Sequence, residues 1–226
     1  MIDPIESFRP NGDKPCLCGS GKAFKHCCGY ESGDRKPPFG VILKRNFLSA
    51  ELCDRTVAYI STQSHDQNLA IIGDEEEGDG LSVQVSKDRV TSRVDMGEKQ
   101  KTIDKWVKKI FNGVVAPKVK KKIRSYTPPD VMRYEPGGYY RPHSDSELFD
   151  PAEGSWKKVL DRDYSLLLYL NDDYEGGALR FEYFKYTYQP RKGDLLVFPS
   201  SLLYLHEAQL VTSGLRYVIV SWASVK

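Results

Sequence analysis

The sequence of 226 residues predicts a mainly β protein with flanking helices and a small cysteine-rich module near its N-terminus. Three observations lead to this fold class. Four of the five cysteines lie between residues 16 and 28, and helical periodicity is confined to two segments before residue 113. From residue 131 onward, short β-branched and aromatic runs alternate with turn residues, as in an all-β sandwich or barrel.

Composition narrows the class of partner and the compartment. The net charge is +2, so the whole-chain balance demands neither a nucleic acid nor a membrane. No apolar run approaches the ~20 residues that span a bilayer, and the first residues lack the features of a secretory signal. We therefore expect a cytoplasmic protein. The basic segment 118–125 (KVKKKIRS) is either a nucleic-acid patch or a solvated helix or turn, and the absence of interleaved aromatic residues favours the second interpretation.

Residues 14–30 contain a Cys-x-Cys pair, eight further residues and a Cys-Cys pair. The four cysteines are Cys16, Cys18, Cys27 and Cys28. In a reducing compartment, four thiolates in a short glycine-containing segment favour tetrahedral zinc over disulfides. Four ligands leave no open position, so we expect a structural Zn(II), with His26 as an alternative ligand. The isolated Cys53 is interpreted as a small buried hydrophobe.

Residues 31–38 (ESGDRKPP) have the composition of a linker, and 39–47 form a candidate strand. Ser49 can then cap a helix that runs to about residue 62, with Cys53, Val57 and Ile60 on one face.

An acidic loop is expected at 73–80, followed by half-buried strands at 81–87 and 90–97. A second helix is expected near 99–112, because its apolar residues recur at helical spacing. Residues 39–130 would thus support a β core at 131–226, which contains Gly-Gly turns at 137–138 and 176–177.

The core contains a candidate metal site. His143 and Asp145 lie two residues apart, so on an extended strand they point to the same side. Alone, such a pair is more often a structural hydrogen bond. His206, on a later apolar strand, would complete the two-histidine, one-carboxylate set of non-haem Fe(II) oxygenases, which leaves three coordination positions open.

Arg216 lies ten residues after His206 on another apolar strand. A guanidinium there is costly to bury unless it meets an anion. The distal carboxylate of an α-keto dicarboxylate would supply that anion in a bidentate pair. A structural salt bridge to a protein carboxylate is the alternative, and both stay open at this stage.

This ordered set of motifs resembles the 2-oxoglutarate/Fe(II)-dependent dioxygenases, and within them the prolyl 4-hydroxylase-like group, over about residues 39–226. The segments that match are YEPGGYYRPHSD, LLLYLNDDYEGGALRF and KGDLLVFPSS, together with the spacing from His206 to Arg216. The resemblance implies a double-stranded β-helix (jelly roll). It also implies that His143, Asp145 and His206 bind Fe(II), and that Arg216 holds 2-oxoglutarate.

The resemblance further implies that Tyr134, Tyr169 and Trp222 line the cosubstrate and substrate pocket, although each could simply pack the barrel. The implied reaction consumes O2 and 2-oxoglutarate, hydroxylates a C–H bond and releases succinate and CO2, with ascorbate as a candidate addition. Residues 14–30 resemble the SEC-C motif. That resemblance implies protein contacts, with ribosomal, translation or chaperone partners as candidates.

The family resemblance favours a prolyl residue of a protein or peptide as the substrate. The segments 73–98 and 146–163 are candidate lips of a groove for a polypeptide, or ordinary surface excursions. The first alternative is an oxygenase acting on a free amino acid, another protein side chain or a nucleic acid. The second alternative is a non-catalytic adaptor that uses the zinc module, and the complete iron set with Arg216 argues against it.

Overall fold

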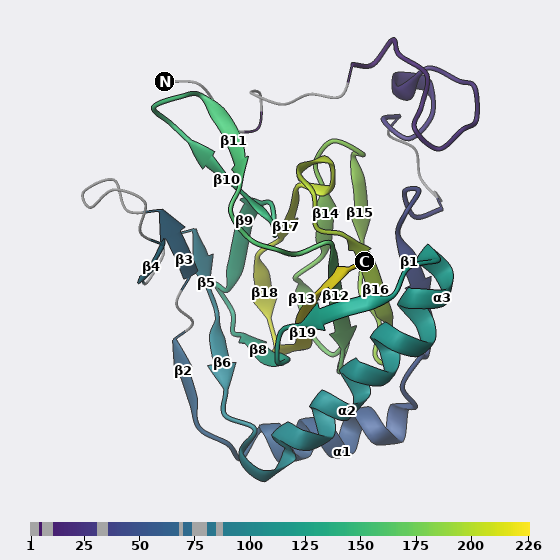
Figure 1. Ribbon diagram of the computed structural model, residues 1–226. Helices are drawn as coiled ribbons and strands as arrows, with labels where there is room; N and C mark the ends of the chain where they lie inside the picture. Colours follow the sequence, from purple (N-terminus) through teal and green to yellow (C-terminus); the bar gives the residue numbers. More distant parts are fainter. Residues whose placement is uncertain (1–4, 6–10, 31–35, 68–69, 74–80, 85–87) are drawn as a thin grey trace.

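The computed structural model describes residues 5, 11–30, 36–67, 70–73, 81–84 and 88–226, and the acidic stretch 74–80 lies outside this range. Its core is a pair of facing antiparallel sheets (Figure 1). The larger, 8-stranded sheet has the order β1-β16-β12-β19-β8-β6-β2, with β7 paired to β19. The smaller, 5-stranded sheet has the order β15-β14-β17-β9-β5. This is the jelly-roll arrangement that the sequence predicted.

The strands of the larger sheet are β1 (Ile42–Lys44), β2 (His65–Gln67), β6 (Ser92–Val94), β7 (Ile123–Tyr126), β8 (Asp130–Tyr134), β12 (Tyr164–Tyr169), β16 (Leu195–Pro199) and β19 (Arg216–Val225). Those of the smaller sheet are β5 (Arg89–Val90), β9 (Tyr139–His143), β14 (Leu179–Phe181), β15 (Tyr186–Tyr188) and β17 (His206–Ala208). Three antiparallel ribbons join β3 (Ala70–Gly73) to β4 (Leu81–Gln84), β10 (Glu147–Asp150) to β11 (Ser155–Lys158), and β13 (Glu175–Gly176) to β18 (Val211–Ser213) within the described residues.

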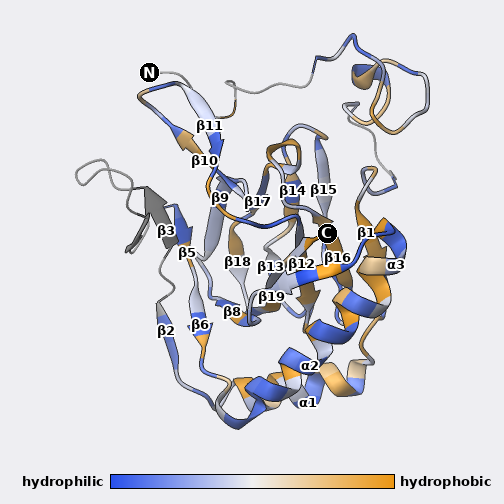
Figure 2. Cartoon of the chain, viewed as in Figure 1, coloured by the Kyte–Doolittle hydropathy of each residue, from blue (hydrophilic) through white to orange (hydrophobic). Residues whose placement is uncertain are grey.

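The helices cover the outer face of the larger sheet, with their apolar sides turned toward it (Figures 1 and 2). Helix α1 (Ala50–Ile60) begins where predicted, because the Ser49 side chain accepts a hydrogen bond from the Leu52 amide at 3.2 Å. Helix α2 (Gln100–Ile110) buries its apolar face and continues through a π segment, Phe111–Val115, into α3 (Ala116–Val119). No helix in the described part of the chain is both long and apolar enough to cross a membrane.

Strand β19 separates the two hydrophobic layers of the molecule. Its alternate residues Tyr217, Ile219 and Ala223 pack beneath the helices. Arg216 and Val218 belong to the opposite series, which lines a pocket between the two sheets. Because side chains alternate along a strand, one segment supplies both the helix-facing core and the wall of the pocket.

Two segments differ from their sequence-based expectation. Residues 118–125 do not form one helix or turn: α3 ends at Val119, Lys120 adopts a left-handed conformation, and β7 begins at Ile123. The lysines there are exposed, as expected. The segment 146–163 contains the antiparallel hairpin β10–β11, because Ser-Trp-Lys-Lys pairs with Glu-Leu-Phe-Asp across a short turn.

The N-terminal module is docked on the β core. The Phe24 ring, in the 3-10 turn Phe24–His26, lies 5.9 Å from the Phe184 ring between centroids, and Phe39 approaches Phe184 at 5.7 Å. Phe24 and Cys16 are buried within the same hydrophobic cluster as the residues between the sheets. The sequence suggested a cysteine module on a linker. The structure adds an aromatic seat for this module, which we define as Phe184, packed against Phe24, together with Phe39.

Candidate active site

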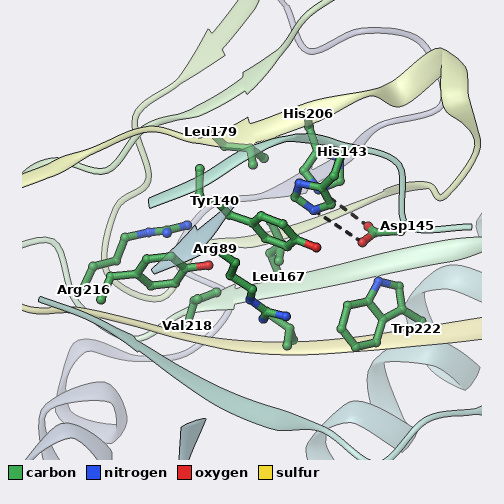
Figure 3. A pocket seen from close by; sticks show the side chains of 13 residues that line it. Arg89, Tyr140, His143, Asp145, Leu167, Leu179, His206, Arg216, Val218 and Trp222 are labelled. Atoms are coloured by element: carbon green, nitrogen blue, oxygen red, sulfur yellow. Dashed lines mark ion pairs between the residues drawn. The ribbon is translucent and has the colours of Figure 1, made fainter. Parts of the chain in front are cut away.

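The two histidines of the predicted metal set lie directly opposite each other on neighbouring strands. His143 is the last residue of β9, His206 is the first of β17, and the two are partners in the sheet register. Asp145 follows β9 by two residues. One nitrogen of each histidine and one carboxylate oxygen of Asp145 all lie within 4.8 Å of one another, as the close-up shows (Figure 3). The structure therefore brings the three predicted side chains together.

Backbone carbonyls fix the protonation of both imidazoles. His143 Nδ1 lies 2.8 Å from the Arg141 carbonyl oxygen, and His206 Nδ1 lies 3.0 Å from that of Tyr204. Since a carbonyl only accepts, each Nδ1 donates, and each Nε2 presents its lone pair toward the shared point. Burial, together with the neighbouring His206, lowers the pKa of His143 to about 3. A neutral imidazole is the form that binds a metal.

The distances from the Asp145 carboxylate to the two histidines are too long for hydrogen bonds. Its two oxygens lie 3.7 Å from His143 Nε2 and 3.6 Å from His206 Nε2. Ser165 of β12 donates a hydrogen bond to Asp145 Oδ2 at 2.5 Å. Burial acts to raise the pKa of Asp145, but His206, His143 and Ser165 outweigh it, and the pKa lies below its usual value. The geometry suits three ligands around an ion better than a structural His–Asp hydrogen bond.

Arg216 is 1% exposed, and its Nε and Nη1 have no hydrogen-bond partner among the described residues. No carboxylate within that part of the chain forms an ion pair with it. Its guanidinium carbon instead lies 4.5 Å from the Tyr134 ring centroid and 5.4 Å from that of Tyr169. Burial opposes its charge, but the surrounding tyrosines raise the pKa of Arg216 above its usual value. A buried, charged guanidinium with free donors fits an incoming carboxylate, and the salt-bridge alternative finds no partner in the part of the chain that the structure describes.

A single pocket joins these groups. It is lined by 13 residues, which include the three metal-site side chains, Arg216, Tyr134 and Trp222, and its empty space is about 450 Å³ with the open mouth included. Tyr134 is the cross-strand partner of Arg216. Tyr169 is fully buried and does not line the pocket, but its ring lies next to Arg216, and burial raises its pKa. The apolar walls come from residues such as Leu167, Leu179 and Val218.

Four residues of the site were not predicted from the sequence. Arg89 and Tyr140 line the pocket, Ser165 holds Asp145, and Arg162 lies over the Trp222 ring at 3.9 Å. Tyr140 stacks on His143 with the ring centroids 3.5 Å apart. Its place three residues before His143 was a usable signal. Arg89 and Arg162 lie in polar surroundings that offered none.

The four cysteine sulfurs form a second candidate metal site. The Sγ atoms of Cys16, Cys18, Cys27 and Cys28 all lie within 4.8 Å of one another, and His26 is exposed outside this group. Hydrogen bonding with Ser20 lowers the pKa of Cys18 to about 6, while burial raises the pKa of Cys28. Four converging sulfurs fit a tetrahedral ion such as Zn(II).

Residues 129–224 match the 2OG-Fe(II) oxygenase superfamily. This segment is a 2OG-Fe(II) oxygenase domain. It contains the three metal-site side chains and Arg216, and residues 14–29 match the SEC-C motif.

Curated relatives of the oxygenase domain include a PKHD-type hydroxylase of Thermosynechococcus vestitus, which is 35% identical over 121 residues, covering 50% of this chain and 47% of that protein. Human prolyl 3-hydroxylase 2 is 36% identical over 89 residues, covering 35% of this chain and 13% of that protein. The chain thus spans less than half the length of these relatives.

Solved structures share the fold. A viral collagen prolyl hydroxylase from Paramecium Bursaria Chlorella virus-1 matches with a TM-score of 0.55 and 22% identity, over 82% of this chain and 97% of that one. A prolyl hydroxylase from Trichoplax adhaerens, in complex with a hypoxia-inducible factor peptide, matches with a TM-score of 0.55 and 20% identity, over 82% of this chain and 83% of that one. At this identity the likeness concerns the jelly roll and its flanking helices.

Proposed function

We propose that the protein is a 2-oxoglutarate- and O2-dependent Fe(II) dioxygenase that hydroxylates a prolyl residue in a protein or peptide. The observation that carries this proposal is the presence, in one pocket, of a His-Asp-His set and a buried arginine with free donors. The first supplies the ligands for iron, and the second supplies an anchor for a dicarboxylate.

His143, Asp145 and His206 would hold Fe(II), and Arg216 would bind the distal carboxylate of 2-oxoglutarate. When bound, iron and 2-oxoglutarate supply an oxidative decarboxylation that hydroxylates a C–H bond and releases succinate and CO2. The chain's own residues orient and protect these groups. Tyr134 and Tyr169 keep the guanidinium of Arg216 in place. Leu167, Leu179 and Val218 exclude water from the pocket.

The four cysteines of the N-terminal module would hold Zn(II) in a structural role. Their mutual distances and the small size of the module support this assignment. The module would serve contacts with another protein, in keeping with its exposed Leu17 and Tyr30.

The prolyl substrate rests on the names of one relative, prolyl 3-hydroxylase 2, and of two structural neighbours, a collagen prolyl hydroxylase and a prolyl hydroxylase bound to a peptide. The hairpin β10–β11 begins two residues after Asp145 and supports an open site for a polypeptide. The matches include a prolyl 3-hydroxylase and the structure of a prolyl-4-hydroxylase, so the product analysis compares carbons 3 and 4 of the proline ring.

The test is succinate release from 2-oxoglutarate with Fe(II) and O2, screened over proline-containing peptides with mass spectrometry of the products. We expect one added oxygen atom on a proline, and we expect Asp145→Asn to abolish it. His65→Gln, at an exposed position on β2, is the matched control and should retain turnover. Oxygen found on other residues alone would overturn the prolyl assignment, and full turnover by Asp145→Asn would overturn the iron site.

A further inference from the structure

The pocket contains a second arginine that the proposed chemistry does not use. Arg89 lies on the two-residue strand β5 and pairs with Tyr140 of β9. In Figure 3 its side chain extends into the pocket between Val218 and Trp222, whereas Arg216 lies at the far end. Its guanidinium carbon is 4.7 Å from the Tyr140 ring centroid, and Tyr140 in turn stacks on His143.

No carboxylate of the described residues forms an ion pair with Arg89, and Asp130 interacts with it only at longer range. Its Nε is buried without a hydrogen-bond partner, and its Nη2 meets only the Met132 sulfur at 3.6 Å, which is a weak acceptor. The nearby carboxylates are engaged elsewhere: Asp88 pairs with Arg141 at 3.4 Å, and Asp130 pairs with Arg93 at 3.7 Å. A partly buried guanidinium in this state is a site for an anion.

Arg162 lies beside the pocket, next to its lining residue Trp222, and adds a second positive charge there. It lies over the Trp222 ring at 3.9 Å, and its Nη1 donates to the Asp145 carbonyl oxygen at 3.2 Å. Burial lowers the pKa of Arg162, and Arg89 contributes to the lowering because the two cations are close enough to repel each other. An anion placed between them would relieve that repulsion.

The charge balance of the site with Fe(II) and 2-oxoglutarate bound also calls for an anion at these arginines. This step rests on the proposed function. The two positive charges of Fe(II) and the one of Arg216 are matched by Asp145 and the two carboxylates of 2-oxoglutarate. The positive charges of Arg89, in the pocket, and of Arg162, beside it, are then left over, and their burial strengthens their field. The substrate is the component still to be added, so it is the component that must carry the compensating charge.

We propose that Arg89, assisted by Arg162, binds a side-chain carboxylate of the substrate, so that the preferred substrate is a polypeptide with Asp or Glu beside the hydroxylated residue. The Nε edge of Arg89 offers the planar pair of donors that a carboxylate accepts. Arg162 donates one of its five N–H groups to the Asp145 carbonyl oxygen, so its remaining N–H groups can assist Arg89.

The experiment compares peptides that differ only at the residue beside a central proline, which is Glu, Gln, Lys or phosphoserine. We expect the wild type to prefer Glu over Gln by roughly tenfold to a hundredfold in kcat/KM, the range of a charge-assisted hydrogen bond. Arg89→Gln should abolish this preference while the KM for 2-oxoglutarate stays within about twofold. Arg89→Glu should shift the preference to the Lys peptide.

Arg55→Gln is the matched control. Arg55 also carries a guanidinium, but it is exposed on α1 and does not line the pocket, so the variant should keep the wild-type preference. Binding of the labelled Glu and Gln peptides, measured by fluorescence anisotropy, should show the same ratio and should weaken with salt only for the Glu peptide.

Several outcomes would overturn the inference. These are equal use of the Glu and Gln peptides by an active wild type, a preference for phosphoserine, better use of free proline than of internal proline, or a raised KM for 2-oxoglutarate in Arg89→Gln. An active enzyme without an acidic preference would leave the proposed function standing. A wild type that forms no succinate with any peptide would instead remove the proposed function itself.

Discussion

Arg216 is a charged residue whose burial opposes its charge. A guanidinium at 1% exposure loses its hydration, and the rings of Tyr134 and Tyr169 return only part of that loss. Such a residue lowers the stability of the ligand-free chain and raises the affinity for an anion. The loss of stability in the ligand-free chain and the gain in affinity for an anion can be measured separately.

Replacing Arg216 with Met should leave the ligand-free protein as stable as the wild type or more so, because a hydrophobic side chain of similar length removes an uncompensated charge. In the presence of Mn(II), 2-oxoglutarate at a hundred times its Kd should stabilise the wild type by about 2.7 kcal/mol and the variant not at all. Thermal unfolding with and without 2-oxoglutarate measures both effects. Equal stabilisation of the two proteins would show that the dicarboxylate binds elsewhere.

His143 makes the metal-free protein sensitive to acid. Its pKa is lowered from 6.5 to about 3, so below pH 6.5 the unfolded chain takes up a proton that the folded chain refuses. Stability therefore falls as the pH falls, by about 2 kcal/mol between pH 7 and pH 5. Urea unfolding of metal-free protein at the two pH values measures this, and His143→Gln should reduce the pH dependence by that amount. An unchanged dependence in the variant would contradict the assignment.

At the scale of elements, the candidate metal site depends on sheet register. His143 and His206 are opposite each other because β9 and β17 pair at that position, and Asp145 is held from a third strand, β12, through Ser165. Ser165 also contacts Ser200 at 2.8 Å, so it is oriented before it reaches the carboxylate. Such partners of a ligand set its direction.

Ser165→Ala should weaken divalent metal binding about 10–100-fold, because Asp145 loses the hydrogen bond that orients it. Ser221→Ala is the control, since Ser221 is equally buried and donates one hydrogen bond, to the Thr127 carbonyl. Titration calorimetry with Mn(II) separates the two variants. Similar affinities in both would reduce Ser165 to a packing role.

The sequence predicted the elements whose signals are local. The capped helix at Ser49, the amphipathic α2 and the crowded strands after residue 131 all follow from nearest neighbours along the chain. Arg89 was missed because β5 is two residues long and is placed by its pairing with β9, which no local pattern encodes. The hairpin at 147–158 was taken for a loop, because its charged and polar residues interrupt the alternation of apolar and polar residues by which a strand is recognised.

At the scale of the whole molecule, the hydrophobic interior consists of two clusters on opposite faces of the larger sheet. One lies beneath the helices, and the other fills the space between the sheets and includes Phe24 of the N-terminal module. The module is therefore part of the interior that supports the pocket. The sequence could place its cysteines, but the seat on Phe184 is a contact across 160 residues.

Phe24→Ala should cost about 1.5–3 kcal/mol, because a nearly buried ring leaves its contact with Phe184. Hydrogen exchange of residues 14–29 should accelerate while that of β9 and β17 changes little. Leu17→Ala, at a side chain that is 68% exposed in the same module, should change neither quantity. Unaltered exchange in Phe24→Ala would mean that the module is held by something other than this seat.

The aromatic seat has a consequence for other proteins that combine these two units. A cysteine module joined to a jelly roll by a short segment can either pack against the jelly roll or be connected to it by the linker alone. Its cysteine pattern is the same in both cases. What distinguishes them is on the jelly roll: an aromatic residue in the turn between β14 and β15, where Phe184 lies, together with one just before β1, where Phe39 lies. The architecture of such chains is therefore better classified by the oxygenase surface than by the module that it carries.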